Sequence, residues 1–204
     1  KTFLEQKMYK EALERFNKAS AINNNNPNPH LYNAQIYKEQ SKLKEAEKEY
    51  RKALLINPNH LECMIGLGEI LVSKHNYEEA TGLLKHALSI DKNNVQIMLN
   101  LAYSYHKLGQ FGYADNYYSN IYEIRPDSVE VNLNYANLLF DIEKYKEAKD
   151  KYETVIKKDN INAEALMKLG IINYLNGNIE EAQKLLIRAK KKGEDSALLL
   201  EYTG

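Results

Sequence analysis

Residues 61–94 read LECMIGLGEILVSKHNYEEATGLLKHALSIDKNN, and they show the repeating pattern of the chain well. Its small residues Gly68 and Ala80 belong to two series that keep a spacing of 34 residues along the chain. The alanine series comprises Ala12, Ala46, Ala80, Ala114, Ala148 and Ala182. The other series comprises Ala34, Gly68, Ala102, Ala136, Gly170 and Gly204. A fixed period of this length indicates a repeat protein, in which each unit buries its apolar face against its neighbours.

Bulky side chains repeat in the same register. One series is Tyr9, Leu43, Tyr77, Phe111, Tyr145 and Ile179, and a second is Phe16, Tyr50, Leu84, Tyr118, Tyr152 and Leu186. Within one period, Met98, Leu101, Ala102 and Tyr105 keep the spacing of one helical face. A second run of this kind starts after the break at 109–110, so each period holds two amphipathic helices.

The sequence therefore predicts an all-α solenoid of antiparallel helix pairs, as one continuous array over residues 1–204. Full units are expected at 27–60, 61–94, 95–128, 129–162 and 163–196. Residues 1–26 are expected to hold the second half of an earlier unit, with 1–6 ending a separate helix. Residues 197–204 are expected to begin a further unit or a capping helix. The small residues should lie where the two helices of a pair cross, because they let the backbones approach.

The composition reduces the number of possible classes of function. Lys and Arg number 28, as do Asp and Glu, so no basic excess suggests a nucleic acid partner. The apolar runs are too short to span a bilayer, so we expect no membrane insertion, and we expect no signal peptide. Cys63 is the only cysteine, which excludes an internal disulfide and fits the reducing cytoplasm. Because the chain opens at Lys1, we expect a segment of a longer protein.

The pattern resembles the tetratricopeptide repeat, a helix–turn–helix unit of about 34 residues. Residues 61–94 carry it at Leu67, Gly68, Leu71, Tyr77, Ala80, Leu84 and Ala87, and residues 27–60 add Ala34, Tyr37, Ala46, Tyr50, Ala53 and Pro58. The resemblance covers essentially the whole chain, although the family's frequent tryptophan is absent. It implies a right-handed superhelix whose first helices line a concave groove. It also implies binding of other proteins, commonly as extended peptides or helices.

The groove positions follow from a stripe on the first helix of each unit, at steps of four, three and four residues. The candidate peptide-binding residues on these stripes are Gln35, Glu69, Asn100, Tyr103, Asn134, Asn137 and Lys168. Over all five units the stripes hold six acidic residues and two lysines, which predicts a mildly acidic groove for a neutral or basic partner. The alternative is that these stripes are ordinary solvated helix faces.

The asparagine residues on the stripes are the most specific candidates for contacts with a peptide. An amide side chain both donates and accepts, so it can hold a peptide backbone without reading its sequence. Asn100 and Asn134, one period apart, resemble the asparagine ladder in the repeat arm of O-linked N-acetylglucosamine transferase. Tyr32, Gly66 and Lys168 interrupt that ladder in the other units, and the chain is rich in asparagine generally. A chaperone-tail site is not expected, because the lysine that such a site needs is missing.

The sequence shows no catalytic motif, metal-ligand motif or phosphate loop, so we expect neither an enzyme nor a cofactor. The main interpretation is a non-catalytic scaffold that binds an extended peptide or helix as part of a multiprotein complex. The alternative is the substrate-selecting arm of an enzyme, such as a glycosyltransferase, whose catalytic domain lies outside this chain. A third interpretation is self-association through the end repeats.

Overall fold

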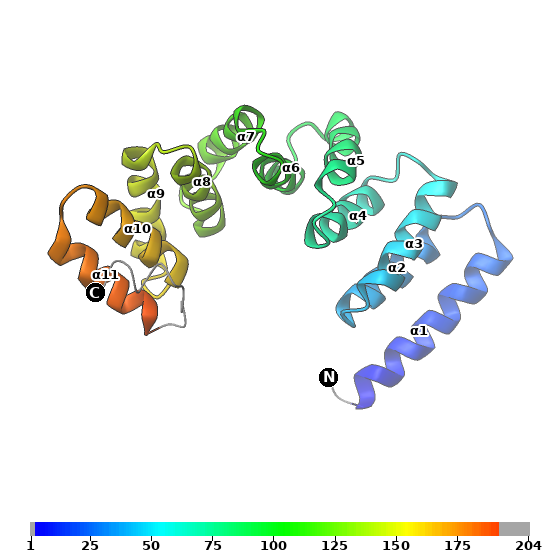
Figure 1. The fold of residues 1–204 in the computed structure, drawn as a ribbon. Coiled ribbons are helices and arrows are strands. Elements are labelled where there is room, and N and C mark those ends of the chain that lie inside the picture. The colour runs from blue at the N-terminus through cyan, green and yellow to red at the C-terminus, as the bar shows by residue number, and fades with distance from the viewer. Residues whose placement is uncertain (1–2, 192–204) are drawn as a thin grey trace. The chain divides into compact units, whose positions relative to one another are not determined.

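In residues 3–191, which are the residues described, a computed structural model contains eleven α-helices and no strand (Figure 1). The helices are α1 (Phe3–Ile22), α2 (Asn28–Glu39), α3 (Leu43–Ile56), α4 (Leu61–Ser73), α5 (Tyr77–Ile90), α6 (Val95–Lys107), α7 (Phe111–Ile124), α8 (Val129–Asp141), α9 (Tyr145–Lys158), α10 (Ala163–Leu175) and α11 (Ile179–Lys190). The prediction of an all-α solenoid of helix pairs is confirmed. The helix expected to begin at 197–204, with Gly204, lies outside the described residues.

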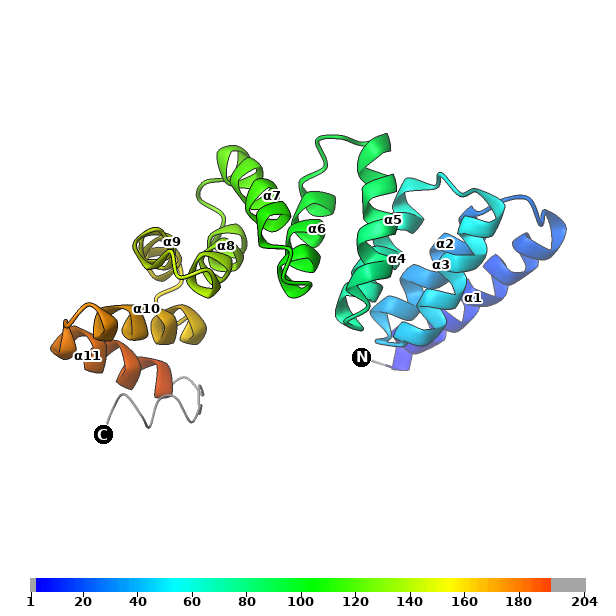
Figure 2. The same ribbon diagram turned by 45° about the horizontal axis from the view of Figure 1, so that its top comes forward.

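The chain divides into two compact units, with the boundary between Leu108 and Gly109. Unit 1 contains α1 to α6 and unit 2 contains α7 to α11, so the boundary falls inside the predicted repeat 95–128. In unit 1 each helix packs on the next, and α2 also contacts α4, which contacts α6 (Figure 2). The first helices of successive repeats thus form one layer in unit 1. In unit 2 the helices likewise pack in chain order.

The turn inside each helix pair has a left-handed residue at the same place. Ser41, His75 and Glu143 have φ of 61°, and Gly109 and Gly177 have φ of 70° and 78°. These five residues are again 34 apart. A positive φ ends one helix and redirects the chain into the next, and it costs a non-glycine residue roughly 1–2 kcal/mol.

The small residues have the predicted steric role. A Cβ added to Gly68 in α4 would lie 2.5 Å from Leu84 Cδ2 in α5. A Cβ at Gly170 in α10 would lie 2.8 Å from Leu186 Cδ2 in α11. Glycine at these two crossings therefore lets a leucine of the second helix lie against the backbone of the first.

One expectation about the start of the chain is wrong. Residues 3–6 do not end a separate helix, because α1 runs without interruption from Phe3 to Ile22. Lys7 lies one period before Ser41, but it is helical and does not have the positive φ of the later turns. Residues 6–8 are good helix formers and include neither glycine nor proline, so nothing in this segment breaks the helix.

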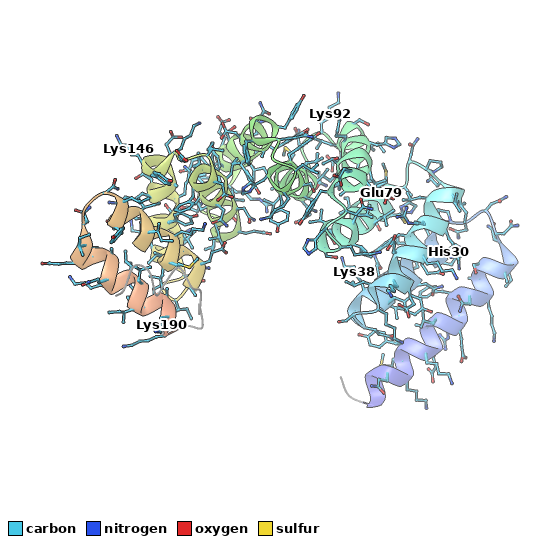
Figure 3. The ribbon with its side chains drawn as sticks, viewed as in Figure 1. His30, Lys38, Glu79, Lys92, Lys146 and Lys190 are labelled. Carbon is cyan, nitrogen blue, oxygen red and sulfur yellow. The ribbon has the colours of Figure 1, made fainter. Side chains whose placement is uncertain are left out.

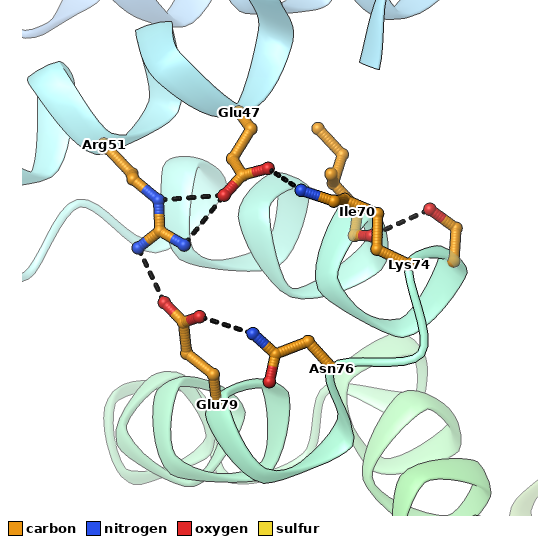
Figure 4. A network of polar contacts seen from close by, with 7 residues as sticks. Glu47, Arg51, Ile70, Lys74, Asn76 and Glu79 are labelled. Atoms are coloured by element: carbon orange, nitrogen blue, oxygen red, sulfur yellow. Dashed lines mark hydrogen bonds and ion pairs between the residues drawn. The ribbon is translucent and has the colours of Figure 1, made fainter. Parts of the chain in front are cut away.

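A charged network links two neighbouring repeats of unit 1 (Figure 4). Glu47 on α3 accepts hydrogen bonds from Arg51 and from Lys74, the residue that follows α4. Arg51 Nη1 also donates to Glu79 on α5 at 2.6 Å, and Asn76 donates to the same carboxylate. The hydrogen bond from Lys74, followed by that from Arg51, holds the pKa of Glu47 below its usual value against the opposing effect of burial.

Candidate functional site

An open hollow of about 520 Å³ lies over α2 and α4 in unit 1. Its lining residues are Gln35, Lys38, Glu39, Tyr50, Glu62, Ile65, Gly66 and Glu69. Five of these eight lie on the predicted groove stripes of residues 27–60 and 61–94, namely Gln35, Glu39, Glu62, Gly66 and Glu69. Two of the five, Gln35 and Glu69, are predicted site residues. The structure thus brings Gln35 and Glu69 together around one hollow.

The floor of the hollow is the ring of Tyr50, which reaches it from α3. Tyr50 is 2% exposed, and a Cβ at Gly66 would lie 2.3 Å from its Cζ atom. Only a residue without a side chain at position 66 leaves room for this ring. Burial, with smaller effects from Cys63, Glu69 and Glu62, raises the pKa of Tyr50 to about 12. Within the described part of the chain, the Tyr50 hydroxyl has no hydrogen-bond partner.

Carboxylates dominate the rim of the hollow. Glu69 is bonded to Lys38 Nζ, whose position on α2 is labelled in Figure 3. Glu39 accepts a hydrogen bond from Tyr9 at 2.6 Å. Glu62 has neither a hydrogen bond nor an ion pair with any residue that the structure describes. Three carboxylates therefore face one ammonium group, and Glu39 and Glu62 have no positively charged partner among the described residues.

Unit 2 contains the equivalent side chains three periods later, and there they are bonded to one another. The Tyr152 hydroxyl donates to Asn137 Oδ1 at 2.6 Å. Asn137 Nδ2 donates in turn to Glu164 Oε1 at 2.9 Å. The equivalents of Tyr152, Asn137 and Glu164 in unit 1 are Tyr50, Gln35 and Glu62, which line the hollow instead of bonding.

The other predicted site residues have varied surroundings. Asn100 has a buried Nδ2 with no hydrogen-bond partner among the described residues. The Tyr103 ring lies 6.2 Å from that of Tyr77 in an edge contact. Lys168 Nζ lies 3.9 Å from the centre of the Phe140 ring. Asn134 is half-buried, and it belongs to unit 2 whereas Asn100 belongs to unit 1, so the asparagine ladder stays a prediction.

Sequence reasoning missed Tyr50, Lys38 and Ile65 as lining residues of the hollow. Tyr50 belongs to a series that continues with Leu84 and therefore predicts a core side chain. The signal that could have found the site is Gly66, the one glycine on the predicted groove stripes, since it leaves its neighbours uncovered.

Metal, thiol and membrane features add no second site. Within residues 3–191, no three His, Cys, Asp or Glu side chains gather as metal ligands would. Cys63 is buried, and burial, with a smaller contribution from Glu62, raises the pKa of its thiol to about 12. None of the described helices combines the length and the apolar character required to cross a bilayer.

Comparisons with known proteins agree with this architecture. Two family models described as tetratricopeptide repeat match residues 3–157 and 143–200. YrrB, described as a TPR protein with an unusual peptide-binding site, is 25% identical, with a TM-score of 0.76 over 93% of this chain and 97% of that one. The chain of pilF from Pseudomonas aeruginosa is 21% identical, with a TM-score of 0.79 over 98% of this chain and 91% of that one.

PilW, described as a widely conserved type IV pilus biogenesis factor, is 20% identical, with a TM-score of 0.77 over 99% of this chain and 94% of that one. A comparison with curated proteins found no match. The likeness to pilF and PilW shows the fold alone. The family models together span most of the sequence, and the helices follow the same period. The chain belongs to the tetratricopeptide repeat family.

Proposed function

We propose that this protein is a non-catalytic scaffold that binds a protein partner over the first helices of its repeats. The observation that carries the proposal is the hollow over α2 and α4, which exposes groove residues from two successive repeats. The fold is typical of protein-interaction scaffolds, and YrrB is described as having a peptide-binding site. A peptide or a helix of the partner would lie along this layer, and the complex would contain further proteins in the cytoplasm.

The partner segment is basic. Glu39, Glu62 and Glu69 outnumber Lys38 around the hollow, so a positively charged segment finds a favourable field. Within unit 1, Asn100 and Tyr103 are further candidate contacts, and within unit 2 the candidates are Asn134, Asn137 and Lys168. Because the attraction is between partly exposed charges, added salt should weaken it.

Selection from a peptide library tests the proposal and requires no identified partner. Random displayed peptides are selected against the whole chain, and the affinity of the selected peptides is measured at low and high salt. Gln35→Arg places a positive charge at the hollow and is expected to weaken binding at least about fivefold. Gln183→Arg, at an exposed position on α11, is the matched control and should leave binding unchanged. Failure to select any peptide, or equal loss in both variants, would count against the scaffold function.

A further inference from the structure

We infer that the hollow in unit 1 receives one arginine side chain of the partner, held by Tyr50, Gln35 and Glu62. This inference rests on the proposed function and deepens it, because it names the side chain that one part of the surface recognises. Three features of the two units support it.

The first feature is the contrast between equivalent side chains. In unit 2, Tyr152, Asn137 and Glu164 satisfy one another through two hydrogen bonds. Tyr50, Gln35 and Glu62 occupy the same places in unit 1, and none of them is bonded to another described residue. The three polar side chains are therefore hydrogen-bonded to one another in unit 2 and not in unit 1. A ligand can therefore form hydrogen bonds with the three side chains of unit 1.

The second feature is the hydroxyl of Tyr50. The side chain is 2% exposed, yet its oxygen lines the hollow without a hydrogen-bond partner in the part of the chain that the structure describes. The hydroxyl faces the open hollow, so a ligand that supplies a donor can bond to its oxygen without breaking a hydrogen bond within the protein. The acidic rim alone would not define a site, whereas this hydroxyl directs a polar partner to one point.

The third feature is the absence of a side chain at Gly66. The equivalent position in unit 2 holds Lys168, whose ammonium group lies over the Phe140 ring. In unit 1 the equivalent of Phe140 is Lys38, and Lys38 is already bonded to Glu69. Glu62 is exposed and is not bonded to a cation among the described residues, so it is available to pair with a cation of the partner.

Arginine fits these groups better than lysine. The hollow offers acceptors in three places, namely the Tyr50 hydroxyl oxygen, the Gln35 carbonyl and the Glu62 carboxylate. A guanidinium group has five donors in a rigid fork and can bond to several of these acceptors at once, whereas an ammonium group is a compact point charge. Ile65 lies in the wall, where it can contact the methylene stem of the arginine.

The test uses five-residue probe peptides with acetylated and amidated ends, Ala-Ala-X-Ala-Ala, in which X is arginine, lysine, citrulline or alanine. Binding to the whole ¹⁵N-labelled chain is followed by the shifts of backbone amides in α2 and α4. We expect the arginine peptide to bind about tenfold more tightly than the citrulline peptide, which has the same shape without the charge, and severalfold more tightly than the lysine peptide.

The same substitutions at equivalent positions of the two units test whether the arginine peptide binds in unit 1. Tyr50→Phe and Glu62→Gln should each weaken the arginine peptide about fivefold or more, whereas Tyr152→Phe and Glu164→Gln should change it less than about twofold. Gln35→Ala is a further test at an exposed position, in case Tyr50→Phe fails to fold. Equal affinity for arginine and citrulline, or equal effects in the two units, overturns the inference.

The proposed function and this inference fail in different ways. If selected peptides bind but the arginine probe produces no shifts in α2 and α4, the arginine site is wrong and the scaffold function stands. If no peptide can be selected and the probe also fails, both are wrong. Arginine-dependent shifts that Glu62→Gln removes support the inference, whatever the remainder of the partner segment is.

Discussion

Tyr50 and Tyr152 occupy equivalent places but differ in one hydrogen bond, which makes them a direct test of the site. Tyr152 donates to Asn137, so Tyr152→Phe leaves a partly buried carbonyl without its donor and should lower the free energy of unfolding by about 1 kcal/mol. Tyr50→Phe removes an unpaired hydroxyl and should change it by less than about 0.5 kcal/mol. Chemical denaturation measures both. A larger loss in Tyr50→Phe than in Tyr152→Phe would show that Tyr50 is bonded within the protein.

The left-handed turn residues allow a second prediction at the residue scale. Ser41 and Glu143 have a φ of 61°, which glycine adopts without steric cost. Ser41→Gly and Glu143→Gly should therefore each stabilise the protein by about 0.5–1 kcal/mol, after the greater flexibility of glycine in the unfolded chain is counted. Ser41→Ala is the control, because alanine has the same backbone strain as serine. If the alanine variant gains as much in thermal unfolding, the strain is not the cause.

The packing of one helix on another depends on where a glycine lies in the pair. Gly68 faces Leu84 across the pair α4–α5, whereas a Cβ at Gly82 in α5 would have nothing within 4 Å. Gly68→Ala should destabilise by about 1–2 kcal/mol, since a Cβ would overlap a buried leucine. Gly82→Ala should stabilise by about 1 kcal/mol, because alanine is the better helix former at an exposed position. Denaturation curves of the two variants should shift in opposite directions, and shifts in the same direction would refute the assigned crossing.

The charged network of α3 to α5 predicts how stability depends on pH. The hydrogen bond from Lys74 lowers the pKa of Glu47 in the folded protein, so this carboxylate stabilises the fold above its unfolded value of about 4.5. That stabilisation is lost as the pH falls through the lower folded pKa. Glu47→Gln should cost roughly 1 kcal/mol at neutral pH.

Unfolding measurements at acid pH test this prediction. The difference between Glu47→Gln and the parent chain should shrink toward zero as the pH is lowered past the folded pKa of Glu47. Glu45→Gln, an exposed change on the same helix, is the control and should show no such convergence. A difference that stays constant from neutral to acid pH would mean that the network does not hold Glu47 in its charged form.

At the scale of the whole molecule, the period predicted most of the fold. Alanine and glycine at 34-residue intervals located the helix pairs, because a crossing tolerates only a small side chain there. The period could not show that α1 is continuous, since Lys7 takes the place of a turn residue and still favours a helix. It also could not show the division between Leu108 and Gly109, which depends on packing between helices and not on local sequence.

The candidate site could be predicted only in part. Gln35 and Glu69 followed from the spacing of groove positions, and the structure brings them together. Tyr50 could not be predicted, because it belongs to a series of core side chains. The hydroxyl of such a tyrosine is accessible to a ligand only where the neighbouring position has no side chain. Gly66 is such a position, because the Tyr50 ring extends from α3 to the backbone of α4 at this glycine. This contact is visible only in the structure.

Hydrogen exchange of the whole chain, with and without a selected basic peptide, tests the central claim that a partner binds over the first helices. We predict slower exchange of backbone amides in α2 and α4, at residues 28–39 and 61–73, and little change in α3 and α5. Protection confined to α3 and α5, or absent from α2 and α4 at saturating peptide, would contradict it.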